Sequence, residues 1–139
     1  MKLILILTAF ITVSNASATE FLTSSQESNV LEAIDNICGD TWCEGDFDYS
    51  FDKINCSVED KSCELSFVYI YKVWNEEINE EVTLGTAPMK CTLSGIASYE
   101  DMIDIERQWL DLSYDFYEKV TECVTDNEDT AYDTIDMGY

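Results

Sequence analysis

Six cysteines constrain the fold of this 139-residue chain more than any other feature of its sequence. They lie at and beyond residue 38, and an apolar segment, Leu3–Val13, precedes them. Lys2 before this segment and Ala16-Ser17-Ala18 after it complete a pattern typical of a cleavable signal peptide. An even number of cysteines behind such a segment indicates disulfides formed in an oxidising compartment. We therefore expect residues 1–18 to be a signal peptide and the protein to be secreted or periplasmic, with no membrane insertion after cleavage.

The positions of the cysteines favour one pairing among the fifteen that six cysteines allow. Two of them flank a polar connection of hairpin length, residues 57–62, and a bridge between them would close a turn. Two others would close the loop after the first helix, and the last two would join a strand to a helix. The predicted disulfides are Cys38–Cys43, Cys56–Cys63 and Cys91–Cys123.

The charge of the chain excludes several classes of partner. Its 29 aspartate and glutamate residues outweigh seven lysine and arginine residues, and the net charge is −22. Such a charge repels nucleic acids and anionic membrane surfaces, and it attracts cationic molecules. A cationic protein or peptide is therefore the expected partner. The alternative is that the acidic surface serves only solubility or life in a saline habitat.

The absence of histidine removes much of the usual catalytic chemistry. Serine–histidine triads, cysteine–histidine dyads and histidine metal sites are all excluded, and no glycine-rich phosphate loop is present. A pair of carboxylates would suffice for a small hydrolase, but in a chain with 29 acids some pair always looks suitable. We therefore expect no enzyme activity and no cofactor, and we keep a carboxylate-dependent hydrolase as an alternative.

The acidic, cysteine-rich stretch 38–56 raises the question of a metal site. Asp40, Glu44 and Asp46 offer the oxygen ligands that calcium prefers, close to two glycines. An EF-hand alignment that starts at Asp46 fails, because Phe51 and Ser57 occupy the positions of the required glycine and glutamate. We expect no metal centre and retain the three acids as candidate calcium ligands only.

Hydrophobic periodicity predicts a helix followed by strands. A short helix is expected that starts between Ser25 and Asn29 and runs to Cys38, ended by Gly39. A strand starts at Phe47, and its alternation changes parity near Lys53, which predicts a β-bulge. The strongest strand signal, apolar on both faces and hence central, is Cys63–Trp74. Residues 81–95 read as one interrupted strand or two short ones, with Pro88 at an edge or bulge.

A long helix is predicted from Ser98 to about residue 124, because a capping-box pattern precedes an apolar stripe at three- and four-residue steps. Residues 125–139 are acidic and weakly periodic, which indicates a mobile tail. The expected fold is a two-layer α+β domain over residues 19–124. It has a short N-terminal helix, an antiparallel sheet of three to four strands, a long C-terminal helix packed on the sheet, and disulfides that join these elements.

These features favour a small non-catalytic module that binds or inhibits a cationic protein or peptide. The other interpretations are the carboxylate-dependent hydrolase and a structural cell-envelope component with no discrete site. Trp42 would either cover the sheet edge or anchor a partner, because it lies in a loop and outside any regular element. The oligomeric state and glycosylation of Asn55 are not predicted. The candidate partner-binding residues are Trp42, Trp74, Glu76, Glu77, Glu80 and Glu81.

Overall fold

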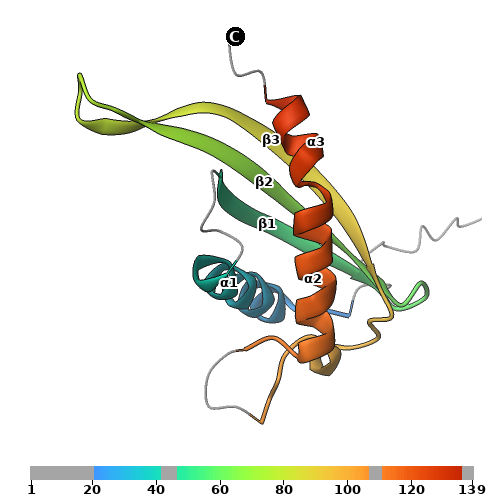
Figure 1. Cartoon of the computed structure of the whole chain (residues 1–139). Helices are drawn as coiled ribbons and strands as arrows, with labels where there is room; N and C mark the ends of the chain where they lie inside the picture. The colour runs from blue at the N-terminus through green and yellow to red at the C-terminus, as the bar shows by residue number, and fades with distance from the viewer. Residues whose placement is uncertain (1–20, 42–46, 107–110, 136–139) are drawn as a thin grey trace, which may run out of the picture.

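The structure, a computed structural model, describes residues 21–41, 47–106 and 111–135, and the predicted signal peptide lies outside these ranges. It is an α+β fold with an antiparallel sheet, as predicted (Figure 1). One helix precedes the three strands in the sequence, and the other helices follow them. The elements are α1 (Ser24–Asp40), β1 (Phe47–Ser57), β2 (Ser62–Asn75), β3 (Glu80–Ser94), the 3-10 helix η2 (Tyr99–Asp101), α2 (Tyr114–Asp126) and α3 (Glu128–Thr134).

The sheet has the order β1-β2-β3, so the strand predicted to be central is central. Successive side chains of a strand point to opposite faces, and β2 buries every second residue along most of its length. The predicted bulge in β1 is confirmed, since the register shifts between Phe51 and Lys53. The shift brings Ile54 and Cys56 into the core. The buried residues of β2 are Cys63, Leu65, Phe67 and Tyr69.

The sequence predicted either one interrupted strand or two short ones over residues 81–95. The structure has a single long strand there, β3. β3 pairs with β2 along its whole length, and it lies at an edge of the sheet, which explains how it accommodates Pro88. Within the described ranges the sheet therefore has three strands.

The first helix begins one residue before the predicted range of starts and ends beyond the predicted stop. Thr23 caps α1 through its side chain, which accepts a hydrogen bond from the Gln26 N–H, while the Gln26 side chain accepts one from the Thr23 N–H. This capping box places the start at Ser24, just ahead of the predicted range. Gly39 does not end the helix, because α1 continues to Asp40. The prediction of a glycine stop was wrong.

The predicted long helix over residues 98–124 was also wrong in its first half. Ser98 does begin a capping box, but it starts only the short η2. The chain then turns, and Ile103 pairs with Leu112 in an isolated antiparallel bridge. Ser113 caps α2, since its Oγ accepts a hydrogen bond from the Phe116 N–H. The apolar spacing continues through both segments because both pack into the same core.

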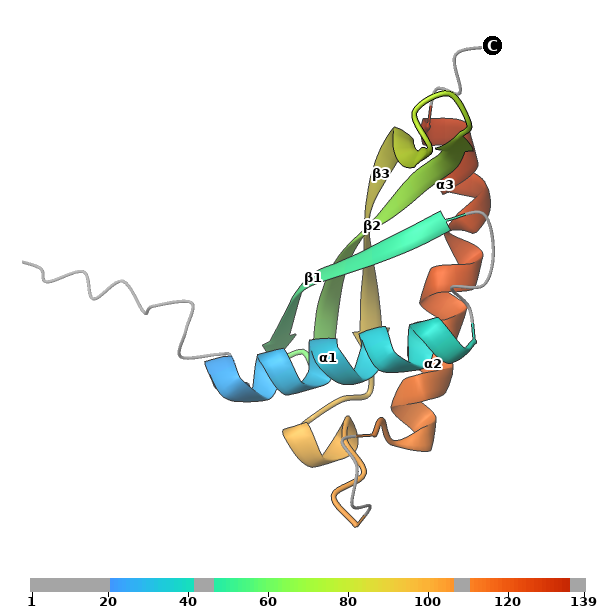
Figure 2. The same ribbon diagram turned by 90° about the vertical axis from the view of Figure 1, so that its left-hand side faces the viewer.

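Part of the predicted mobile tail is ordered helix. α3 follows α2 after a single residue and continues nearly in its direction (Figure 2). Ala131 of α3 and Ile135 directly after it are buried in the core. The acidic composition of residues 125–135 therefore misled the prediction, because two small or medium apolar side chains suffice to pack this segment against β3.

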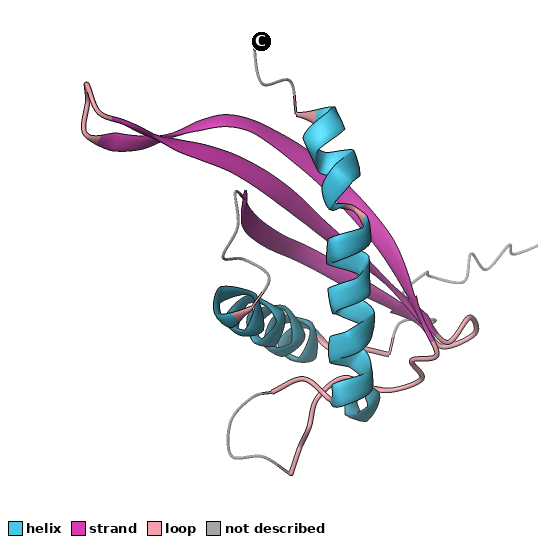
Figure 3. Cartoon of the chain, in the orientation of Figure 1, coloured by secondary structure: helices cyan, strands magenta, loops and turns pink. Residues whose placement is uncertain are grey.

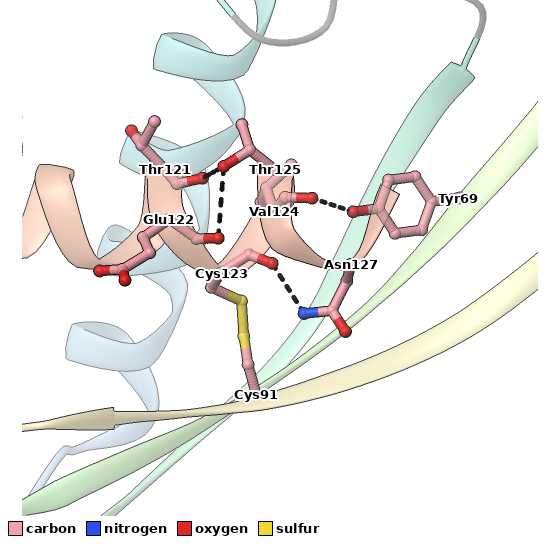
Figure 4. Close-up of a disulfide and its surroundings, with 8 residues drawn as sticks. All are labelled: Tyr69, Cys91, Thr121, Glu122, Cys123, Val124, Thr125 and Asn127. Atoms are coloured by element: carbon pink, nitrogen blue, oxygen red, sulfur yellow. Dashed lines mark hydrogen bonds between the residues drawn. A yellow bond between two sulfur atoms is a disulfide. The ribbon is translucent and has the colours of Figure 1, made fainter. Parts of the chain in front are cut away.

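Two of the three predicted disulfides are confirmed. Cys56 and Cys63 lie opposite each other on β1 and β2, with their Cα atoms 4.0 Å apart. Cys91 of β3 is bonded to Cys123 of α2 (Figure 4). Cys38 is also disulfide-bonded, but Cys43, its predicted partner, lies outside the described residues.

A hydrogen bond reinforces the junction of sheet and helix near the second disulfide. The buried Tyr69 hydroxyl donates to the carbonyl oxygen of Val124 in α2 (Figure 4). One covalent and one polar contact thus hold α2 on the sheet. Burial raises the pKa of this tyrosine above its ordinary value, and nearby Tyr49 and Glu128 raise it further.

Gly85 is a position where packing requires glycine. A Cβ atom there would lie 2.6 Å from Cγ2 of the buried Ile135, far closer than van der Waals contact allows. We predict that Gly85→Ala lowers the free energy of unfolding in urea by about 1–2 kcal/mol, because Ile135 must move out of its site. Gly39→Ala is the matched control, since nothing lies within 4 Å and alanine favours the helix. Unchanged stability of Gly85→Ala would contradict this packing.

Candidate functional site

The strands β2 and β3 continue together beyond the point where β1 begins. The first residue of β1, Phe47, pairs with Tyr71, and four further pairs from Lys72–Thr83 to Asn75–Glu80 join β2 and β3 alone. We call residues 72–84 the projecting hairpin. It extends away from α1 and α2 and beyond the start of β1 (Figures 1 and 3). Among the described residues no third strand pairs with it, so much of its surface is open to a partner.

A β-bulge lies at the base of the projecting hairpin. The register of β2 and β3 shifts between Tyr71 and Lys72, whose partners are Gly85 and Thr83. Leu84 is the extra residue between these partners. Bulges bend a strand and increase its local twist. The direction of the hairpin thus changes at the position where the sheet narrows from three strands to two.

The projecting hairpin concentrates exposed apolar surface. Six large hydrophobic side chains of the described residues are exposed, and three of them lie within this segment of thirteen residues. Trp74 is 57% exposed, Ile78 is 55% exposed and Leu84 is 46% exposed. Single exposed apolar residues are ordinary on a protein surface, but a cluster indicates an interaction site.

The same segment carries all four of the predicted partner-binding acids. Glu76, Glu77, Glu80 and Glu81 are all exposed, and they surround the apolar side chains along the strand ends and the turn. The hairpin has a single lysine, Lys72, at its base, and its Nζ lies 2.9 Å from the Asp48 carboxylate. The hydrogen bond with Asp48 raises the pKa of Lys72. The distal part of the hairpin is therefore purely acidic.

The turn of the projecting hairpin is held by its own side chains. Asn75 Oδ1 accepts hydrogen bonds from the N–H groups of Glu77 and Ile78, at 2.9 and 3.4 Å. Asn79 adopts a left-handed conformation with φ of 55°, which asparagine tolerates better than most residues. The backbone that presents Ile78 is thus preorganised.

The remaining sequence candidates are not placed in this site. Trp42, Glu44, Asp46 and the side chain of Asp40 lie outside what the structure describes, so the calcium and Trp42 hypotheses stay predictions. Among the described side chains, no group of three or more acids or cysteines is arranged to hold a metal ion.

Several surface hollows of the described residues are lined by two carboxylates, as expected for so acidic a chain, and one of them is the most apolar in its lining. That hollow, a cavity of about 350 Å³, is lined by Asp104 and Asp111, with Thr41, Tyr114 and apolar neighbours around them. Each aspartate accepts a hydrogen bond from a backbone N–H in its own turn, of Glu106 and Leu112 respectively. The Asp104 N–H also donates to the Asp111 carbonyl oxygen. These hydrogen bonds show that both aspartates stabilise the turn that precedes α2.

Two residues of the projecting hairpin were missed in the sequence. Ile78 lies between acids in the turn, and Leu84 lies in a strand of otherwise ordinary composition. Their exposure depends on strand pairing and on the position of the bulge, which the composition of the segment does not reveal. An isoleucine inside an acidic turn was the one feature that would have marked the site.

No protein-family model, curated protein or solved structure matches this chain. Among the described residues, no helix is both long and apolar enough to cross a membrane. The fold and site together define a disulfide-bonded α+β protein with an acidic, apolar-tipped hairpin.

Proposed function

We propose that the protein is an exported, non-catalytic module that binds or inhibits a cationic protein or peptide through the projecting hairpin. The observation that carries this proposal is the exposure of Trp74, Ile78 and Leu84 among four glutamates. Apolar side chains supply most of the binding free energy in a protein interface once they are desolvated. The glutamates determine the charge of the partner and speed its association.

The charge of the chain argues against the other ways of covering this apolar surface. Two copies, each with a net charge of −22, repel each other, which disfavours self-association through the hairpin. An anionic membrane surface repels the same glutamates. The two described disulfides are compatible with work in an oxidising compartment, where basic secreted proteins would be encountered.

A charge-matched pair of variants tests the proposal. The hairpin variant changes Glu76, Glu77, Glu80 and Glu81 to glutamine. The control variant changes four exposed glutamates elsewhere, so both variants carry the same net charge. The control positions are Glu32, Glu59, Glu100 and Glu106.

Binding is measured by calorimetry at 150 mM salt against lysozyme, ribonuclease A and an octalysine peptide as cationic probes. We expect the hairpin variant to bind at least one probe about tenfold more weakly than the wild type, a difference of about 1.4 kcal/mol. The control variant should lose less than about threefold, because it changes only long-range electrostatics. Equal losses in both variants, or no binding of any probe by the wild type, would overturn the proposal.

The carboxylate-dependent hydrolase remains the second candidate, because Asp104 and Asp111 share a hollow. Hydrolysis of polysaccharide or peptide substrates that disappears in Asp104→Asn and Asp111→Asn, with folding intact, would favour it. We rank it lower because both carboxylates already accept hydrogen bonds from the backbone of their turn.

A further inference from the structure

We infer that the partner of the projecting hairpin is the concave site of a folded cationic protein, which the hairpin enters as a wedge. This inference rests on the proposed function and adds the shape of the partner to its charge. It is drawn from the position of the exposed apolar side chains, the width of the hairpin and its lack of a third strand within the described ranges.

The exposed apolar side chains are spread along the whole hairpin. Trp74 projects from β2 in the pair with Glu81, Ile78 lies in the turn, and Leu84 is the bulged residue at the base. These three positions span the length of the segment from its base to its tip. A partner that buries all three must therefore contact the hairpin from its base to its tip, which a cleft that receives the hairpin lengthwise would do.

The hairpin has the dimensions of an inserting element. Its four distal strand pairs are only two strands wide, and neighbouring strands lie about 5 Å apart. A narrow, convex element of this kind fits a cleft or pocket, whereas a linear peptide has no concavity to receive it. Ligand-binding and substrate clefts are the common concave sites of small proteins.

Preorganisation of the tip supports insertion. The hydrogen bonds from Glu77 and Ile78 to Asn75 fix the turn before any partner binds. A fixed loop loses less conformational entropy on binding than a mobile one, which strengthens the complex. Ile78 at the tip would be desolvated deepest in the cleft, and the flanking glutamates would face basic groups at its rim.

A matched pair of turn variants tests the role of the tip. Ile78→Ser removes the apolar side chain from the turn of the projecting hairpin. Val58→Ser removes a comparable one, 50% exposed, from the turn between β1 and β2. Both variants change a solvent-exposed residue of a hairpin turn, so both should remain folded.

The probes are lysozyme and ribonuclease A, two folded cationic hydrolases with open substrate clefts, and linear octalysine. We expect the wild type to bind one of the hydrolases at 150 mM salt at least tenfold more tightly than octalysine, and to raise its apparent KM without changing kcat. Ile78→Ser should weaken binding and inhibition at least fivefold, while Val58→Ser should match the wild type.

The outcomes separate this inference from the proposed function. Three results would overturn the insertion of the hairpin into a cleft: equal affinity for octalysine and the hydrolases, an unchanged KM, or unchanged binding by Ile78→Ser. Each of them would leave the proposed binding of cationic partners standing. The absence of binding to any of the three probes would overturn both.

Discussion

Replacing Cys91 and Cys123 with serine should lower the free energy of unfolding by about 3–4 kcal/mol. The bridge joins β3 to α2 and closes a loop with a sequence separation of 32 residues. Closing a loop of this length removes much conformational freedom from the unfolded chain. The folded state should keep its sheet, because the partner strands and the core around Leu65 and Phe67 remain.

The matched comparison is the variant with Cys56 and Cys63 replaced by serine. That bridge has a sequence separation of only seven residues, and its loss should cost about 2–3 kcal/mol. Urea unfolding with the remaining disulfides intact measures both effects. A larger loss for the short bridge than for the long one would contradict the view that Cys91–Cys123 is the principal tie between sheet and helix.

The protein should lose stability as the pH rises above 10. Burial, with a smaller contribution from Glu128, raises the pKa of Tyr49 to about 12, and burial raises that of Tyr69 as well. Below pH 10 these tyrosines are neutral in both the folded and unfolded chains, so their contribution to stability is fully present. Between pH 10 and 12 the unfolded chain releases protons that the folded chain retains, and unfolding becomes more favourable.

The expected loss is on the order of 3 kcal/mol by pH 12, after Tyr49 is discounted for its partial exposure. It is measured by rapid pH jump and denaturant unfolding, before alkali cleaves the disulfides. The double variant Tyr49→Phe, Tyr69→Phe starts from a lower stability, because the hydrogen bond to Val124 is gone. Its stability should nevertheless fall less steeply with pH. If stability fell equally steeply with pH in the variant and the wild type, Tyr49 and Tyr69 would not be the cause of the alkaline loss.

Strand alternation made the sheet predictable. The alternation in β2 defined its buried face, and the change of parity near Lys53 located the bulge, because a period of two leaves little freedom in assigning faces. The disulfide between Cys91 and Cys123 followed from placing one cysteine on a strand and the other on a helix.

Helical periodicity was a weaker guide in the C-terminal part. Met102, Leu112 and Phe116 are all buried, so their spacing fits a continuous helix as well as a turn followed by a helix. The Ser113 cap and the Ile103–Leu112 bridge decide between these, and both depend on tertiary contacts. The burial of Ile135 could not be predicted either, because it depends on the space beside Gly85, a residue 50 positions earlier in the chain.

The acidic half of the candidate site was predictable and the apolar half was not. Charge can be counted in a sequence, and the glutamates around Trp74 were identified in that way. Ile78 and Leu84 are exposed in residues 72–84, where β2 and β3 pair with each other and the described residues supply no third strand.

The most direct test of the binding role is a titration of the isotope-labelled protein with lysozyme or ribonuclease A, followed residue by residue in amide correlation spectra at 150 mM salt. The largest shifts are expected at residues 74–81, including the side-chain N–H of Trp74, with little change at Glu32, Glu59 and Glu100. Shifts spread evenly over the acidic surface, or centred on α2, would contradict the assignment of the projecting hairpin as the binding site.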